Sequence, residues 1–228
     1  MRPLIAIISV IALVAIAALA SAARSGQLAP PAAPTPRVWD WPSAAPTDQP
    51  ARSHPLLVSG FIIPLGGLDV PSEEQYLPNS PRAYRAGYHE GIDFPAPRGT
   101  PVLAAKAGTI TRIDTSFVDW SADEAQAAFD AAQALGYTPA QTLDRLRGRQ
   151  VWIDHGGAVV TRYAHLSAVE PLRTGDLVTQ GQLVGAVGSS GFPEGGPHLH
   201  FEIRVGDDFY GDGLPLPQLR YALSAAFR

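Results

Sequence analysis

Two short stretches of the chain carry side chains that can bind a metal ion. Residues 198–205 read HLHFEIRV, in which polar and apolar residues alternate. With the period of two of a β-strand, both histidines, Glu202 and Arg204 share one face, and the apolar residues share the other. The second stretch, HEGID, begins with an imidazole at His89 and ends with a carboxylate at Asp93. These ligand types, with one position open for water, are typical of catalytic zinc sites, so the pattern indicates hydrolytic zinc chemistry.

The pair His89-Glu90 also looks like the start of the helical His-Glu-x-x-His motif, in which the glutamate is the general base. The fifth residue here is Asp93, however, and Gly91 and Pro95 lie where the helix would have to continue. Both residues oppose a helix interior. The segment is therefore predicted to be a short strand or a loop that enters one, with Glu90 a neighbour of the site rather than its base.

These motifs, in this order, resemble the lysostaphin/LytM-type zinc endopeptidases, which cut peptide cross-bridges in bacterial peptidoglycan. The resemblance covers residues 87–115 and 150–205. Its segments are HEGIDFPAP from His89, GTPVLAA from Gly99, GTI from Gly108, YAHL around His165, GQLVG from Gly181, GSSG from Gly188 and HLHFEI from His198.

The resemblance implies that His89, Asp93 and His200 hold one zinc ion per chain. It implies that His165 and His198 flank the metal-bound water as catalytic residues. Histidine titrates close enough to neutral pH to serve as a base or as an acid, and which of the two plays which part stays open. The function implied is hydrolysis of peptide cross-links or stem peptides of peptidoglycan. A catalytically silent relative that activates other wall hydrolases is the alternative, and the intact set of five residues favours the enzyme.

Four further residues have two interpretations each. His155 begins a His-Gly-Gly turn and is predicted to be structural. Tyr84 and Tyr88 precede the first motif, and either phenol could face the oxyanion or simply pack. Glu202 could orient a ligand imidazole, or be an ordinary solvated carboxylate of the strand.

Composition limits the classes of protein to which the chain can belong. It has 228 residues, a net charge of −4 and no cysteine. Without a basic surface it is not expected to bind nucleic acid, and without cysteine it has neither disulfides nor a thiolate metal site. We expect one zinc endopeptidase domain over residues 53–228, acting as a monomer.

The N-terminus indicates export to the cell envelope. Residues 4–20 are almost continuously apolar and predict a hydrophobic helix, and small residues follow. Residues 1–23 are therefore either a cleaved signal peptide or an uncleaved anchor that tethers the chain to the membrane. Residues 24–52 are rich in Pro and Ala and are predicted to be a semi-extended linker.

The remainder is predicted to be mainly β, as an antiparallel sheet or folded barrel with a groove for the metal. Runs rich in β-branched residues alternate with Gly and Pro turns. The clearest runs are Val102–Ala105, Gly108–Ile113, Val151–Ile153 and Val159–Tyr163.

An insertion at residues 116–149 interrupts this β pattern. A capping box that begins at Ser121 predicts one helix, which Gly136 closes, and Pro139 starts a second helix that ends near Gly148. The resembled family usually has a short hairpin here. We expect the insertion to border the substrate groove and restrict which cross-bridges enter, the alternative being a neutral surface elaboration. Replacing it with a short turn is expected to leave folding and zinc binding intact.

Overall fold

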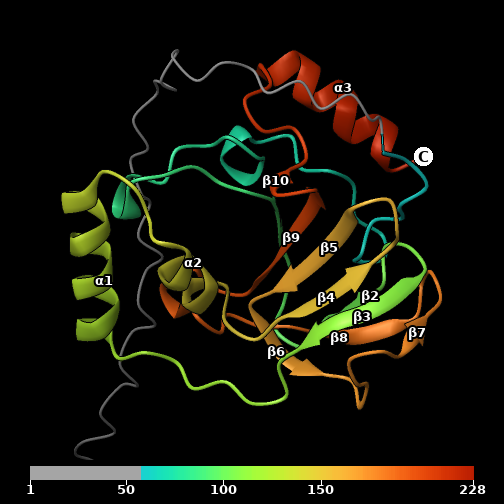
Figure 1. The fold of residues 1–228 in the computed structure, drawn as a ribbon, viewed down its shortest axis with the longest axis horizontal. Helices are drawn as coiled ribbons and strands as arrows, with labels where there is room; N and C mark the ends of the chain where they lie inside the picture. Colours follow the sequence, from blue (N-terminus) through green and yellow to red (C-terminus); the bar gives the residue numbers. More distant parts are fainter. Residues whose placement is uncertain (1–57) are drawn as a thin grey trace, which may run out of the picture. The chain divides into compact units, whose positions relative to one another are not determined.

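The structure, a computed structural model, describes residues 58–228 (Figure 1). Two antiparallel β-sheets form the centre of this part of the chain. The predicted signal or anchor, the linker and the first residues of the predicted domain lie outside it. The larger sheet has the order β1-β9-β5-β4-β3-β7, with β10 also paired to β9. Its strands are β1 (Ile92–Pro95), β3 (Gly108–Ile113), β4 (Val151–Asp154), β5 (Val159–Ala164), β7 (Leu177–Val178), β9 (His198–Val205) and β10 (Asp208–Phe209).

The smaller sheet has the order β2-β8-β6. Its strands are β2 (Pro101–Leu103), β6 (Leu166–Val169) and β8 (Leu183–Val187). All strand pairs in both sheets are antiparallel, which confirms the predicted mainly β class. The predicted run Gly108–Ile113 is a strand with the same bounds, and the HEGID segment enters β1 rather than a helix.

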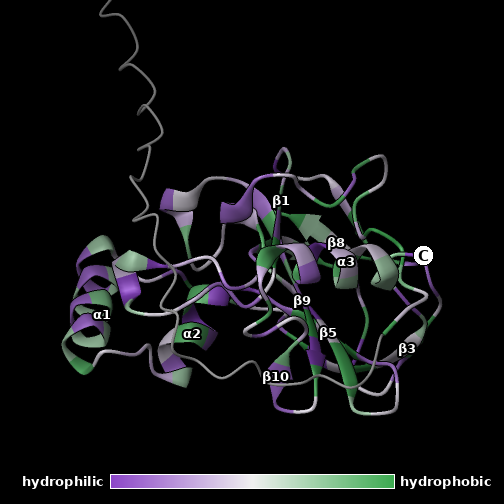
Figure 2. Cartoon of the chain, turned by 90° about the horizontal axis from the view of Figure 1, so that it is seen from above, coloured by the Kyte–Doolittle hydropathy of each residue, from purple (hydrophilic) through white to green (hydrophobic). Residues whose placement is uncertain are grey.

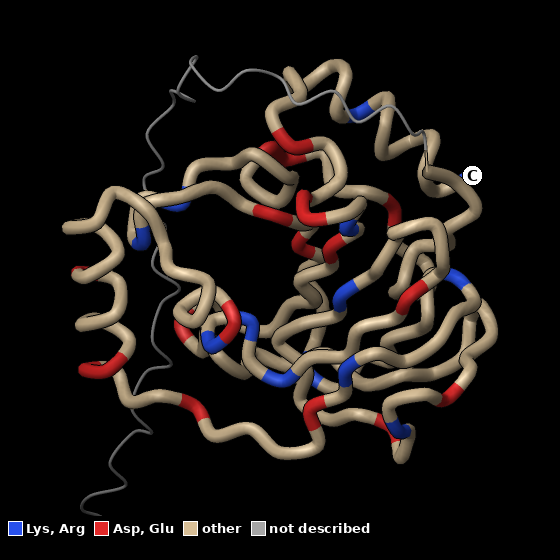
Figure 3. Tube along the Cα trace, in the orientation of Figure 1, with Lys and Arg blue, Asp and Glu red and all other residues tan. Residues whose placement is uncertain are grey.

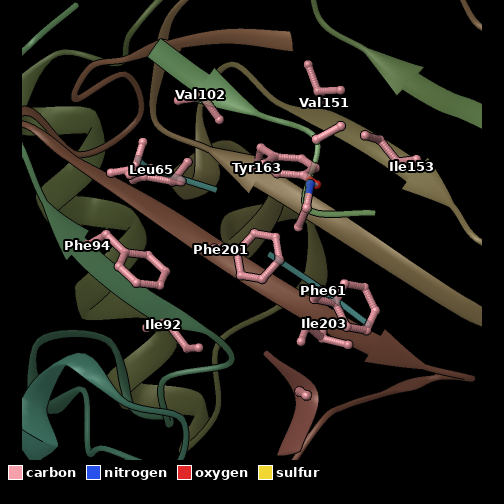
Figure 4. Packing of buried hydrophobic residues seen from close by; sticks show 14 of the residues in the cluster. Phe61, Leu65, Ile92, Phe94, Val102, Val151, Ile153, Tyr163, Phe201 and Ile203 are labelled. Carbon is pink, nitrogen blue, oxygen red and sulfur yellow. The ribbon is translucent and has the colours of Figure 1, made fainter. Parts of the chain in front are cut away.

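The hydrophobic core contains residues from strands of both sheets (Figure 4). The C-terminal helix contributes to it as well. From β9, Leu199, Phe201 and Ile203 point into it, as the alternating pattern predicts. Hydrophobic and hydrophilic positions both occur along strands such as β5 and β9 (Figure 2). The other face of β9 is largely buried too, because side chains from other segments, Arg147 among them, cover Glu202. The interpretation of Glu202 as a solvated carboxylate is therefore wrong.

The two helices predicted in the insertion are present as α1 (Ala122–Leu135) and α2 (Ala140–Arg147). Both hydrogen bonds of the capping box at Ser121 form, and Gly136 ends α1 in the left-handed conformation with a φ of 74°. Three 3₁₀ turns were not predicted: η1 (Glu74–Tyr76), η2 (Ala83–Arg85) and η3 (Pro193–Gly195).

A third helix, α3 (Leu216–Ala226), was also not predicted. It packs Leu219, Leu223 and other apolar residues onto the main core. Within the described range, none of the helices combines the length and hydrophobicity that crossing a membrane requires.

The insertion extends from the end of β3 to the start of β4, where Ile113 and Val151 face each other across the pair. Its two helices differ in their distance from the sheet. Helix α2 lies between α1 and the strands, and α1 stands farther out (Figures 1 and 2). The end of α2 is therefore the part of the insertion that approaches the large sheet.

Candidate metal centre and its surroundings

The three predicted metal ligands come together at the edge of the large sheet. Asp93 of β1 and His200 of β9 are direct partners in the antiparallel register, so pairing of the two strands places one beside the other. His89 precedes β1, and its backbone is held on both sides by hydrogen bonds to Asn79 and Ser80, at 2.9 and 2.8 Å. The sheet and this short ladder therefore fix all three side chains.

The three ligand atoms form a nearly equilateral triangle. Asp93 Oδ1 lies 2.9 Å from His89 Nε2 and 2.9 Å from His200 Nδ1, and the two nitrogens are 3.0 Å apart. In a tetrahedral zinc site with bonds of about 2.0–2.1 Å, ligand atoms are about 3.3–3.4 Å apart. The triangle needs to widen by only a few tenths of an ångström, so the residues fit a metal ion of this size.

The outer nitrogens of the two imidazoles make hydrogen bonds that leave the inner nitrogens as acceptors. His89 Nδ1 lies 2.9 Å from the carbonyl oxygen of Leu77, and His200 Nε2 lies 3.0 Å from Glu202 Oε1. Each outer nitrogen must donate to its oxygen, which assigns the tautomers. Two nitrogen lone pairs and the carboxylate of Asp93 then converge on one point. Only a cation or a shared proton can relieve the repulsion among them.

Charges around the site set the protonation of these groups. Burial lowers the pKa of His89 to about 3, so its imidazole is neutral. Burial alone would raise the pKa of Asp93, but the neighbouring imidazoles, His89 first, hold it well below its usual value. Burial would lower the pKa of His200, yet hydrogen bonds to the carboxylates of Asp93 and Glu202 raise it. A metal ion at the inner nitrogen of His200 would therefore compete with a proton for the same lone pair.

The two predicted catalytic histidines lie beside this triangle. The ring centroids of His165 and His198 are 4.6 Å apart, and His198 Nε2 is 3.7 Å from Asp93 Oδ1. Their Nδ1 atoms face the carbonyl oxygens of Ser190 and Gly196, at 2.8 and 2.9 Å. Each Nδ1 therefore carries the hydrogen, which leaves Nε2 as the nitrogen that can exchange protons with a substrate or water.

His165 has an unusual backbone conformation. It lies directly after β5 with a φ of 60°, in the left-handed region that residues other than glycine seldom adopt. Burial, and then the proximity of His198 and His200, lower its pKa well below the usual value, so it is a neutral base at neutral pH. Strained backbone of this kind is often found at functional sites.

A buried cluster of charges lies behind His200. Glu202 is fully buried, and its carboxylate contacts Arg147, Arg162 and Arg204. Glu90 bridges Arg147 and Arg204 from the other side, at 2.5 and 2.8 Å. Burial would raise the pKa of Glu202, but Arg147 and the other cations hold it well below its usual value. Over the described trace as a whole, positive and negative positions are interspersed (Figure 3).

The insertion also contributes an aromatic cluster next to the site. The ring of Phe129, from α1, meets the rings of Tyr84 and Trp120 edge-on, at centroid distances of 5.2 and 5.5 Å. Tyr84 stacks on Phe192 at 5.2 Å, and the Phe192 ring lies 6.5 Å from that of His165. Trp120 donates its indole N–H to the carbonyl before Phe192, at 2.8 Å. Side chains of α1 thus support a loop that reaches a predicted catalytic histidine.

The remaining sequence candidates take other places. His155 lies between the carbonyl of Ala107 and the hydroxyl of Thr161, at 2.8 and 2.9 Å, as expected of a structural residue. Tyr84 packs in the aromatic cluster, and the carbonyl oxygen of Tyr88 accepts a hydrogen bond from Arg85 at 2.6 Å. Glu202 orients His200, which was one of its two predicted interpretations.

Two arginines that contact the site were missed by sequence reasoning. Arg82 donates to Asp93 Oδ2 at 3.1 Å, and Arg147 bridges Glu90 and Glu202. Arg82 lies in a loop with no motif of its own. Arg147 is the last residue of a helix, where a basic side chain is expected for the helix dipole alone. Neither position carried a local signal that pointed to the metal centre.

The family model described as peptidase family M23 matches residues 87–211, more than half of the chain, and the chain belongs to this family. It is 36% identical over 142 residues to the DD-carboxypeptidase/endopeptidase Mpg of Neisseria meningitidis, covering 61% of this chain and 26% of that protein. It is 30% identical over 117 residues to the peptidoglycan DD-endopeptidase ShyC of Vibrio cholerae, covering 51% of this chain and 20% of that protein.

Among solved structures, the catalytic domain of lysostaphin from Staphylococcus simulans is 26% identical to this chain. The comparison covers 61% of this chain and 85% of that domain, with a TM-score of 0.40. The chain thus spans about a quarter or less of the two curated relatives described above.

Proposed function

We propose that the chain is a zinc-dependent endopeptidase that hydrolyses peptide bonds of bacterial peptidoglycan. Membership of a peptidase family supports the reaction class. The printed names of the relatives, which include a peptidoglycan DD-endopeptidase, support the substrate. The observation that carries the proposal is the convergence of three lone-pair donors, from His89, Asp93 and His200, on a single point.

Zinc is the ion that this donor set fits best, because two imidazoles and one carboxylate leave a fourth position open. When bound, zinc supplies a Lewis acid that polarises a carbonyl and lowers the pKa of water to near neutral. The protein holds the ion through fixed imidazole tautomers and through Asp93, whose second oxygen accepts a hydrogen bond from Arg82.

His165 and His198 would transfer protons during the reaction. Both rings lie beside the ligand residues with the hydrogen on Nδ1, and His165 is neutral at neutral pH. One can take a proton from the attacking water, and the other can donate one to the departing amine, since an imidazole acts as a base when neutral and as an acid when protonated. The carbonyls of Ser190 and Gly196 keep both rings in the required tautomer.

Separate sets of variants test the ligand and catalytic assignments. His89→Ala, Asp93→Ala and His200→Ala should each lose stoichiometric zinc, measured by elemental analysis of purified protein. His165→Ala and His198→Ala should keep one zinc per chain and lose activity by about 10²–10⁴-fold, the usual contribution of general acid–base catalysis. His155→Gln is the matched control, because it removes a histidine outside the site. Stoichiometric zinc in all three ligand variants would overturn the assignment.

The substrate is tested by digesting purified peptidoglycans that differ in cross-bridge and identifying the fragments by mass. Products cut within cross-links or stem peptides support the proposal. A protein that holds zinc yet releases no fragments from any of them would instead be the catalytically silent relative. Export to the envelope, by a cleaved signal or a retained anchor at residues 1–23, belongs to the same proposal and is tested by fractionating cells and sequencing the N-terminus of the mature protein.

A further inference from the structure

Helix α2 of the insertion ends in a residue that reaches into the surroundings of the metal centre. Arg147 is the last residue of α2 and is 8% exposed. Its Nε donates to Glu202 Oε1 at 2.5 Å, and its Nη2 donates to Glu90 Oε2 at 2.5 Å. The guanidinium thus joins two carboxylates from different segments. One of these segments directly follows His89, and the other is β9.

The contact with Glu202 bears directly on a metal ligand. Glu202 Oε1, the oxygen that Arg147 contacts, is also the oxygen that accepts the hydrogen bond from His200 Nε2 at 3.0 Å. That hydrogen bond fixes which nitrogen of His200 faces the metal. An arginine that holds this oxygen in place therefore holds the orientation of the imidazole.

The other arginines near Glu202 do not duplicate this contact. Arg162 and Arg204 both approach the second oxygen, Oε2, and each does so at 3.4 Å. They contribute positive charge, but only Arg147 binds Oε1 closely. Charge neutralisation is thus shared among three residues, whereas positioning of Oε1 depends on one.

The backbone at the end of α2 makes a second connection to the site. The carbonyl oxygen of Arg147 accepts a hydrogen bond from the amide of His165 at 2.8 Å. Gly148, with a φ of 68°, packs so closely on Ser190 that an added Cβ would lie 2.1 Å from the Ser190 carbonyl oxygen. That same oxygen accepts from His165 Nδ1. The exit from α2 is therefore built into the surroundings of both His200 and His165.

We propose that Arg147 is a positioning residue of the metal centre: through Glu202 it orients His200 for the ion, so that the helical insertion contributes to metal binding. This inference rests on the proposed function in that it takes His200 as a ligand. Residues that orient metal ligands from outside typically change metal affinity by about 10–100-fold when they are altered. Because Arg147 acts one contact farther out, we expect its loss to weaken zinc binding about 10-fold.

The test compares two arginines of the same helix. Arg147→Gln and Arg147→Lys are matched with Arg145→Gln and Arg145→Lys, because Arg145 contacts Glu124 and Trp120 inside the insertion. Zinc dissociation constants are measured by competition with a chromogenic chelator. Arg147→Gln should raise the constant about 10-fold, and Arg147→Lys less, since an ammonium keeps the charge without the planar fork. Both Arg145 variants should bind zinc as the unaltered protein does.

Two further measurements separate positioning from general destabilisation. The visible spectrum of bound Co²⁺, which reports ligand geometry, should change in Arg147→Gln and not in Arg145→Gln. In a double-mutant cycle, Arg147→Gln should weaken zinc binding little further once Glu202 is replaced by Gln, because the two act as a unit. If Arg147→Gln does not fold, the two lysine variants carry the comparison.

Equal zinc affinity in Arg147 and Arg145 variants would overturn the inference, as would additive effects of Arg147→Gln and Glu202→Gln. Both results presuppose that the unaltered protein binds zinc. If the unaltered protein and every variant fail to bind the ion, it is the proposed function that fails instead. The two failures are therefore distinguishable in one set of titrations.

Discussion

Glu202→Gln is the substitution whose cost the structure determines most directly. Glutamine has nearly the same shape as glutamate, so packing around β9 is kept while one buried negative charge is removed. Three arginines share two glutamates in this cluster, and the variant leaves them one. The amide nitrogen would also face Arg162 and Arg204, donor against donor, at positions where the carboxylate now accepts.

Removing one partner of a buried ion pair costs about 3–5 kcal/mol, because the remaining charge stays buried without compensation. For a domain of this size, about 1 kcal/mol lowers the melting temperature by about 2–4 °C. We therefore expect Glu202→Gln to lower the melting temperature by about 6–20 °C. The free energy of unfolding is measured by urea denaturation and by heating, in the presence of a chelator so that loss of metal does not contribute.

Arg145→Gln serves as the control here too, because its partner is on the surface of the insertion, and exposed pairs contribute about 0–1 kcal/mol. A loss of less than about 1 kcal/mol in Glu202→Gln would refute the reasoning. It would mean that Glu202 is not needed as an anion in the folded protein, and that the arginines are neutralised in some other way.

Two further predictions concern the insertion and His155. Replacing residues 116–149 with a short Gly-containing turn should change the relative rates on peptidoglycans of different cross-bridge. The sequence alone led us to expect intact zinc binding, but because Arg147 is lost with the insertion we now expect weaker zinc binding. Unchanged rates and affinity would make the insertion a neutral elaboration. Burial lowers the pKa of His155 in the folded protein. As the pH falls, His155 of the unfolded chain therefore takes up a proton first. The stability that His155 contributes is present above about pH 6.5 and is lost as the pH falls below that value. His155→Gln should therefore flatten the fall in unfolding free energy as the pH drops below about 6.5, and a slope identical to that of the unaltered protein would contradict this assignment.

The predictions from sequence succeeded where the signal is local. The capping box at Ser121, the glycine stop at Gly136 and the alternation along β9 each follow from neighbouring residues, and each is present in the structure. The three candidate ligand residues, which the resemblance had grouped, lie together in the structure, and their role as metal ligands stays a prediction. Such signals need no knowledge of how distant segments pack.

Features that depend on distant contacts were not predicted. Whether Glu202 faces water depends on what covers β9, and its covering comes from the end of an insertion 55 residues away. The contact of Arg82 with Asp93 depends on a loop that has no regular pattern. Helix α3 has an apolar face that becomes evident only when the core it covers is known. Side-chain partners of this kind are decided by tertiary structure, which one sequence does not reveal.

Because strand register places Asp93 opposite His200, a bound ion would also stabilise the folded state. The two residues are 107 positions apart, and closing so long a loop costs roughly 4 kcal/mol in chain entropy beyond a constant term. Strand β1 is also an edge strand of its sheet, held on one side only by β9. An ion present at about 100 times its dissociation constant returns about 2.7 kcal/mol to the folded state. Removal of the metal would then destabilise strand β1 as well as stop the reaction. When the ion is scarce, the protein would therefore be degraded faster by other proteases.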